Sequence, residues 1–485
     1  MKRAHYAGCL LAALTCAFAA PAAELPKSAN LAHWQREDIP VFRSSFMSLD
    51  RSFTAEARKA AEARLTALAH ASEPLTPAAF AVELCRIAAL ADNGHTQCMP
   101  HHVGRHVCER FADLVTEEAV WCKLREPDFE IPEFVSLPIA FYPFGEDFHV
   151  VRVSPEHEDL LGARLIAVDD RAVADMRAEL RTFSGGTPAY RDIEAARVLS
   201  SPMQLQVVGL AKQTDAVTYT LVLRSGQHVN RRFSLPTKPA SAVEWRRLPA
   251  ADTAPWAFQE PDKPFRFRDA PEAEAFVIQL RQTLDDGGEK IMDFLLDAER
   301  RRQQLGRDNV VLDMRENGGG NLLLIRDFMR NWPDRVPGHF YVLTSRETFS
   351  AAIASIGYLK QAGGDRVSII GEAIGDRLVF FSDGLPVQLP HSGLFFLPAV
   401  LRMDFADGCR EYADCFEAVA QPDGPAAPTL LALPPGTPRL PISVGTLDPN
   451  VSAPWTIESW INGTDPAMQA VIELQSEVKK HSARE

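Results

Sequence analysis

A regular alternation of strand-like and helix-like segments is the feature that most constrains the fold of this chain. Apolar runs typical of buried strands are separated by stretches with helical spacing, in the order strand 275–280, helix 289–304, strand 309–314, helix 321–330, strand 340–344, helix 350–361 and strand 367–370. Strands that alternate with helices in this way predict a parallel or mixed sheet covered by helices.

The segments before this block have other patterns. Residues 54–71 have helical spacing, and Thr76-Pro77 opens a second helix that ends near Asn93-Gly94. Short strands follow at 148–153, 161–169 and 217–223. We therefore predict an α/β (α+β multidomain) fold, divided into a signal peptide (1–23), a helical N-terminal domain (24–135), a small β-rich module (136–237), a connection (238–272) and a βαβ-type mixed-sheet catalytic core (273–485).

The first 23 residues have the pattern of a secretory signal peptide. Lys2 and Arg3 precede an apolar run over residues 7–20, and the small residues of Ala20-Pro21-Ala22-Ala23 offer a cleavage site. No later apolar run reaches the length of about 18 residues that a membrane span needs. We expect a periplasmic or secreted protein without a membrane span.

The number of cysteines is consistent with an exported protein. Two of the eight, Cys9 and Cys16, lie in the signal peptide, and an even number remains. Disulfides are expected in an oxidising compartment. Cys409 and Cys415 are close enough in sequence for a local bridge, whereas Cys85, Cys98, Cys108 and Cys122 form a cluster whose connectivity stays open.

Composition and net charge limit the classes of binding partner that we expect. The chain of 485 residues is 46% hydrophobic and 24% charged, as in ordinary globular proteins, and its formal net charge is -13. An acidic surface argues against nucleic acid and anionic membranes as partners.

A serine stands where a strand gives way to a helix. Arg346-Glu347-Thr348-Phe349-Ser350-Ala351-Ala352 follows the apolar run 340–344 and opens the helix-like run that ends near Gln361. Backbone amides point outward at a helix start, and the helix dipole favours negative charge there. Ser350 is therefore well placed for a nucleophile whose reaction builds an oxyanion.

A glycine loop lies upstream of this serine. The apolar strand that ends at Asp313-Met314-Arg315-Glu316-Asn317 runs into Gly318-Gly319-Gly320 and then a helix. Three glycines leave the backbone amides open to an oxyanion or a phosphate. No Gly-Lys-Ser/Thr follows, so this is not a phosphate-binding Walker loop.

Together, the two motifs resemble the core pattern of the tail-specific (C-terminal-processing) serine peptidase family. Three further segments are similar to motifs of that family: 370–375 (Ile-Gly-Glu-Ala-Ile-Gly), 389–394 (Leu-Pro-His-Ser-Gly-Leu) and 462–466 (Asn-Gly-Thr-Asp-Pro). Residues 161–169 resemble the ligand-groove strand of the PDZ-like module that these peptidases often carry. The resemblance implies a peptide or protein substrate and no cofactor.

The resemblance leaves open which residue serves as the catalytic base. Many members of the family use a lysine on the strand after the helix of the serine, but this chain has no lysine between Lys360 and Lys479. Lys360 itself lies on the same helix, roughly 15 Å from Ser350. A histidine-base branch, with tricorn-core and interphotoreceptor retinoid-binding protein modules, has an Asp-Gly-His-Thr motif that Asp92-Asn93-Gly94-His95-Thr96 resembles. His95 is therefore predicted as the base.

The remaining members of the site follow from the same resemblance. Glu372 is predicted as the carboxylate that orients His95, with Asp92, Asp376 and Glu411 as alternatives. The branch has a serine directly before its histidine, whereas this chain has Gly94, so its serine-linked tetrad does not carry over whole. The predicted oxyanion hole consists of the amides of Gly318 or Gly319 and of Ala351.

The chain contains other histidines that could serve as a base or as metal ligands. His391 could serve as a base, but the family has asparagine there, which favours a structural role. The residues His95, Cys98, His101, His102, His106 and Cys108 crowd one segment, but their spacings do not fit a zinc finger or a His-Glu-x-x-His helix. The sequence thus predicts an exported serine peptidase without a metal, with a catalytically silent binding protein for peptide or hydrophobic ligands as the alternative.

Overall fold

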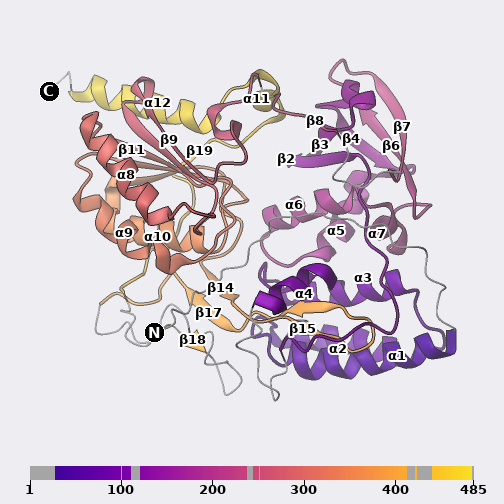
Figure 1. The fold of residues 1–485 in the computed structure, drawn as a ribbon. Helices are drawn as coiled ribbons and strands as arrows, with labels where there is room; N and C mark the ends of the chain where they lie inside the picture. The colour runs from indigo at the N-terminus through magenta and orange to yellow at the C-terminus, as the bar shows by residue number, and fades with distance from the viewer. Residues whose placement is uncertain are drawn as a thin grey trace.

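The computed structural model describes residues 28–99, 101–110, 121–236, 244–250, 252–411, 421–422 and 440–482. The predicted signal peptide and Cys415 lie outside these ranges. Figure 1 shows a molecule with the core sheet on one side and the helical and antiparallel parts on the other, with β14 (Val379–Ser382) and β17 (Leu401–Asp404) between them. No helix in the described ranges is long and apolar enough to cross a membrane.

The N-terminal part is helical, as predicted. It comprises α1 (Ser28–Val41), α2 (Ala55–Ala69), α3 (Pro77–Ala88) and α4 (His101–Arg110). Thr54 and Thr76 accept hydrogen bonds from the amides of Ala57 and Ala79, which caps α2 and α3. A short turn, η2 (Ala89–Ala91), then ends at Asp92 with a left-handed backbone (φ 52°). This sharp ending turns the chain toward His95.

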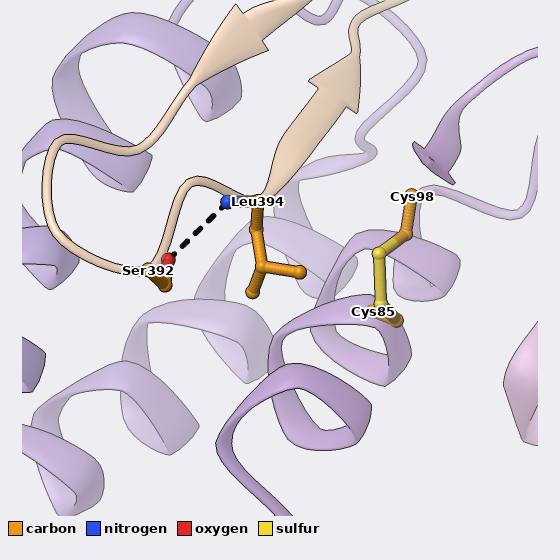
Figure 2. Close-up of a disulfide and its surroundings, with 4 residues drawn as sticks. All are labelled: Cys85, Cys98, Ser392 and Leu394. Atoms are coloured by element: carbon orange, nitrogen blue, oxygen red, sulfur yellow. Dashed lines mark hydrogen bonds between the residues drawn. A yellow bond between two sulfur atoms is a disulfide. The ribbon is translucent and has the colours of Figure 1, made fainter. Parts of the chain in front are cut away.

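A small sheet joins this helical part to residues far along the chain. β1 (Gln97–Met99) pairs with β16 (Phe395–Leu397), which pairs with β15 (Val387–Gln388), all antiparallel. Figure 2 shows the segment with Ser392 and Leu394 close to the disulfide Cys85–Cys98, where the amide of Leu394 donates to Ser392 Oγ. Leu394 is buried in the same hydrophobic cluster as α3. The family-like segment 389–394 therefore packs on the N-terminal helices.

The middle of the chain forms an antiparallel sheet. Its strands are β2 (Ile139–Phe144), β3 (Asp147–Val153), β4 (Arg164–Val168), β5 (Arg171–Ala172), β6 (Ala216–Val222), β7 (His228–Ser234) and β8 (Arg246–Arg247). The predicted strands at 148–153, 161–169 and 217–223 fall on β3, β4 and β6. The sequence did not predict the helices between them, which are α5 (Val173–Leu180), α6 (Pro188–Val198) and α7 (Pro202–Val207).

The core is a mixed sheet, and each predicted strand of the βαβ block is present. Its order is β19-β13-β12-β11-β10-β9, in which only β9 runs antiparallel to its neighbour. The strands are β9 (Phe265–Ala270), β10 (Ala275–Leu280), β11 (Asn309–Asp313), β12 (Phe340–Thr344), β13 (Val367–Gly371) and β19 (Val451–Ser452). Because β10 to β13 are parallel, their carboxyl ends share one edge of the sheet, as in other α/β sites.

Helices cover both faces of this sheet. The helices α8 (Ile291–Gln304), α9 (Arg326–Asn331) and α10 (Ala351–Gly363) share one hydrophobic cluster with the strands, and α12 (Pro466–Ser482) packs in another. The predicted helix 321–330 is split into a short turn, η9 (Leu322–Leu324), and α9. The short helix before α12, α11 (Ile457–Asn462), packs through Trp460 against Phe144 of the antiparallel part.

Candidate active site

Ser350 lies in a strained turn at the start of α10. Its backbone angles are φ 55° and ψ -124°, a region that is costly for a residue with a side chain. The loop before it is held to the end of β11, because Thr348 Oγ1 donates to the carbonyl of Met314 at 2.9 Å and Ser345 Oγ donates to that of Arg315. The surrounding loop thus imposes the turn on Ser350.

The glycine loop is anchored by a buried ion network. Arg315 donates two hydrogen bonds to Asp313 and two to Asp465, each between 2.8 and 2.9 Å. Bidentate pairs of this kind fix geometry strongly. Asp465 belongs to the third family-like segment, so residues 150 positions apart fix the end of β11 together.

Ser350 and the glycine loop are in direct contact. The amide of Phe349 donates to the carbonyl of Asn317 at 3.0 Å. A Cβ added to Gly319 (φ 107°) would lie 2.6 Å from Ser350 Cβ and 3.1 Å from the amide nitrogen of Ala351. Only glycine fits this position, and its backbone therefore lies beside the serine and the first amide of α10.

The predicted oxyanion amides differ in their availability. The amide of Gly319 donates to Asn317 Oδ1 at 2.9 Å and is engaged within its own loop. Ala351 is the first residue of α10, so its N–H has no acceptor in the helix. Gly318 is exposed at the tip of the loop. In this conformation the amide of Gly319 is therefore engaged, whereas that of Ala351 has no acceptor within the helix.

His95 lies in an aromatic sandwich next to this turn. Its ring stacks on Phe349 (centroids 4.5 Å apart) and on Phe380 of β14 (4.9 Å apart). Phe349 directly precedes Ser350, and consecutive Cα atoms are about 3.8 Å apart. A histidine from the N-terminal part and the serine from the core, which are 255 positions apart in the sequence, are therefore close neighbours in the fold.

The carboxylate nearest to His95 is Asp376. Its Oδ2 lies 3.4 Å from His95 Nδ1, and the two residues are only 2% and 8% exposed. Neither ring nitrogen of His95, nor Asp376 Oδ2, has a hydrogen-bond partner among the described residues. The other oxygen of Asp376 accepts the amide of Arg377 at 2.8 Å. Buried polar groups without partners each cost about 1–3 kcal/mol, so this pair is poised to form a bond.

Glu372, the carboxylate that the sequence favoured, has a different partner. Its oxygens accept hydrogen bonds from Arg346 at 2.9 and 3.4 Å, and both side chains are largely buried. The arginine comes from the loop of Ser350, so the pair ties that loop to the end of β13. Of the alternatives, Asp92 pairs with Arg191 and Arg377, and Glu411 is exposed.

Three parts of the chain meet around His95. Gly185 of the antiparallel part packs against the backbone of Asn93, and Thr187 Oγ1 donates to the carbonyl of Gly375 at 2.9 Å. Tyr190 of α6 also stacks on Phe349, with ring centroids 4.8 Å apart. The candidate site therefore lies at the junction of the helical part, the antiparallel part and the core.

Gly94 has a steric role in this junction. A Cβ at this position would lie 2.7 Å from the ring of Phe349. A serine, which the histidine-base branch carries before its histidine, would collide with the ring that covers His95. The Phe349 ring can therefore occupy this place only because residue 94 has no side chain.

His391 and the cysteines of the crowded histidine segment have partners in the fold. The ring nitrogens Nδ1 and Nε2 of His391 lie 2.7 Å from Asp128 Oδ2 and Glu37 Oε2, which ties the 389–394 segment to α1. Cys98 and Cys108 are in disulfides with Cys85 and Cys122, and Cys409 is disulfide-bonded too. In the described ranges no three His, Cys, Asp or Glu residues are grouped to hold a metal ion.

The aromatic neighbours of the site were not predicted from the sequence. Phe380 and Tyr190 are 285 and 95 positions from His95 in the chain, and no local pattern indicates a stack. Phe349, in contrast, stands inside the predicted serine motif, and its position beside Ser350 was the one available signal.

Comparison with solved structures shows which fold this is. The chain aligns with a CPAF mutant (TM-score 0.54, 12% identity, 93% of this chain and 97% of that one) and with mature CPAF in complex with lactacystin (0.52, 12%, 94% and 99%). An alignment with the photosystem II D1 C-terminal processing protease has a TM-score of 0.38 at 14% identity, over 90% of this chain and 97% of that one. No protein-family model and no curated protein matches the sequence. The fold is that of the tail-specific (S41) peptidases, at low sequence identity.

Proposed function

We propose that this protein is an exported serine peptidase in which Ser350 attacks a peptide carbonyl and His95 takes its proton. The observation that carries the proposal is the stack of His95 on Phe349, directly beside a serine in a strained turn. A free hydroxyl is a poor nucleophile, and an adjacent histidine is the usual means of activating it. An acyl-enzyme forms and is then hydrolysed by water.

Asp376 is the carboxylate that we assign to His95. In the neutral imidazole, Nδ1–H donates to Asp376 Oδ2 and Nε2 keeps its lone pair, and a small rotation of either side chain closes the present 3.4 Å separation. Nε2 is then the atom that exchanges a proton with Ser350, as in other triads. Catalytic hydrogen bonds are often long without substrate and shorten in the complex.

The tetrahedral oxyanion is held by the amides of Gly318 and Ala351. Both belong to loops that open a helix or follow a strand, so their N–H groups are fixed before the reaction begins. Gly319 contributes a third donor if its bond to Asn317 Oδ1 opens. No cofactor takes part in this chemistry.

The antiparallel part is assigned the role of a PDZ-like module that presents a peptide or protein substrate along a strand edge. The disulfides Cys85–Cys98 and Cys108–Cys122 support an oxidising, periplasmic or extracellular location.

The test is hydrolysis of a library of internally quenched peptides by the mature protein. We expect cleavage by the wild type and its loss in Ser350→Ala and in His95→Ala, with circular dichroism showing that both variants fold. Cleavage that persists in Ser350→Ala, after purification to a constant specific activity, would overturn the proposal.

A second candidate function, a catalytically silent binding protein, is favoured by two observations. The amide of Gly319 is engaged, and His95 is covered by aromatic rings. This candidate predicts peptide binding of equal affinity in the wild type and Ser350→Ala, with no cleavage in either. Titration of uncleaved peptides against both proteins by calorimetry separates the two functions.

A further inference from the structure

Asp92 has no part in the proposed chemistry, but it lies three residues before His95 in the chain. It ends the short turn η2 with a left-handed backbone (φ 52°, ψ 39°), a conformation that aspartate and asparagine adopt more readily than most residues. Its side chain is 49% exposed. Asp92 therefore stands on the surface of the turn whose inner side carries His95.

Two arginines from different parts of the molecule converge on Asp92. Arg377 of the core donates from Nη2 to Asp92 Oδ2 and from Nη1 to the backbone carbonyl of Asp92, at 2.8 Å each. Arg191 of α6 donates from Nη2 to Asp92 Oδ1 and from Nε to the carbonyl of Gly186. Each oxygen of this carboxylate thus has its own cation. Two bonds from one guanidinium to the same residue fix geometry as well as charge.

Arg377 leads directly to the carboxylate of the proposed triad. Its amide donates to Asp376 Oδ1 at 2.8 Å, and Asp376 Oδ2 lies 3.4 Å from His95 Nδ1. The turn that carries His95 and the turn that carries Asp376 are therefore joined twice. One link is the exposed ion pair of Asp92 with Arg377, and the other is the buried contact of His95 with Asp376.

Asn93 supplies a separate anchor for the same turn. Its side-chain amide donates to the carbonyl of Phe381 at 3.0 Å, and its Oδ1 accepts the amide of Phe381 at 3.3 Å. Phe381 follows Phe380, whose ring stacks on His95. Asn93 thus holds the turn against β14 at one point, and Asp92 supplies the second point that fixes its orientation relative to Asp376.

The magnitudes indicate an effect on geometry rather than on stability. Ion pairs between exposed side chains contribute only about 0–1 kcal/mol to folding. A displacement of about 1 Å at a catalytic group, in contrast, can lower a rate by about 10²-fold. The separation of 3.4 Å between His95 and Asp376 leaves little room for such a displacement.

On this basis, and resting on the proposed peptidase function, we propose that Asp92 is a positioning residue for the pair of His95 and Asp376. It acts through Arg377, which holds the two turns at the separation that the pair needs. Its bond to Arg191 holds α6 of the antiparallel part against the same turn.

The test measures kcat and KM for an internally quenched peptide that the wild type cleaves. Asp92→Asn keeps the shape of the side chain and tolerates the left-handed backbone, and Arg377→Gln removes the cation. We expect each to lower kcat by about 10-fold with KM little changed, less than the loss of a catalytic group, because Asn93 still holds the turn. The double variant should lose no more than the stronger single variant, since both remove one link.

Two controls separate positioning from a general structural effect. Asp297→Asn removes a carboxylate of similar exposure that pairs with Arg300 on α8 at 2.9 Å, and kcat should not change. The melting temperatures of Asp92→Asn and Arg377→Gln should stay close to that of the wild type. A loss of kcat that appears only with a large drop in melting temperature would overturn the proposal.

Other outcomes also contradict it. An unchanged kcat in Asp92→Asn, a change confined to KM, or additive losses in the double variant would show that Asp92 does not act through Arg377. So would an Arg191→Gln variant that matches the loss in Asp92→Asn while Arg377→Gln keeps full kcat.

Failure of the positioning role and failure of the function are distinguishable. If cleavage requires Ser350 and His95 but Asp92→Asn and Arg377→Gln cleave at the wild-type rate, the positioning role alone is wrong. If the wild type neither reacts with a fluorophosphonate nor cleaves any peptide, the proposed function is wrong and the positioning role falls with it.

Discussion

At the scale of single residues, the proposed mechanism depends on which carboxylate is bonded to His95. Glu372 occupies the family-like position, but Arg346 takes both of its oxygens. Asp376 keeps one oxygen for the amide of Arg377 and leaves the other beside His95. A motif position says where a carboxylate stands in the chain, whereas its role depends on which cation or imidazole the fold brings to it.

The two carboxylates should therefore behave differently when neutralised. We expect Asp376→Asn to lower kcat by about 10²-fold or more with KM little changed, because the imidazolium loses its partner. The pH profile of kcat/KM should shift as well, a change that a merely structural residue would not cause.

Glu372→Gln is the comparison. It leaves Arg346 without its ionic partner in a largely buried place, so we expect a lower melting temperature and a smaller effect on the pH profile. Equal pH profiles for wild type and Asp376→Asn would contradict the assignment of Asp376.

At the scale of elements, the turn with His95 is tied down at both ends. The disulfide Cys85–Cys98 links α3 to β1 and closes a loop that contains His95 (Figure 2). The second disulfide, Cys108–Cys122, closes a loop of nearly the same length, with separations of 13 and 14 residues. Because the two loops are nearly equal in length, the second disulfide can serve as a control for the first.

Removal of either bridge should cost similar stability but different activity. In the chain-entropy picture loops of this length contribute about 3 kcal/mol each. We expect the double variant Cys85→Ser/Cys98→Ser to lose more peptidase activity than Cys108→Ser/Cys122→Ser at a temperature where both are folded. Denaturant unfolding and peptide hydrolysis on the same samples measure the two effects, and equal activity losses would show that the first bridge does not position His95.

At the scale of the whole molecule, the elements with a clear local sequence pattern could be predicted, whereas the contacts made by long-range packing could not. The strands β10, β11, β12 and β13 are short apolar runs between helices with clear spacing, and the sequence located them within a residue or so. The helix α6 carries the same Thr-Pro start as α3, so a signal for it was present and was overlooked.

Other features depend on contacts that no local pattern encodes. The pairing of β1 with β16 joins residues about 300 positions apart, and the sandwich of His95 needs rings from both the core and β14. The choice between Asp376 and Glu372 follows from where Arg346 lies. The sequence could therefore indicate which residues to examine, while their partners had to come from the fold.

The central claim is that His95, from the helical part, activates Ser350 in the core. The most direct measurement is the second-order rate constant for labelling by a fluorophosphonate, with the modified residue identified by peptide mass mapping in the wild type and in His95→Ala. We predict an adduct on Ser350 and a rate constant at least about 10²-fold lower in His95→Ala, as expected for a lost general base. An adduct on another residue, or equal rate constants in the two proteins, would contradict the account.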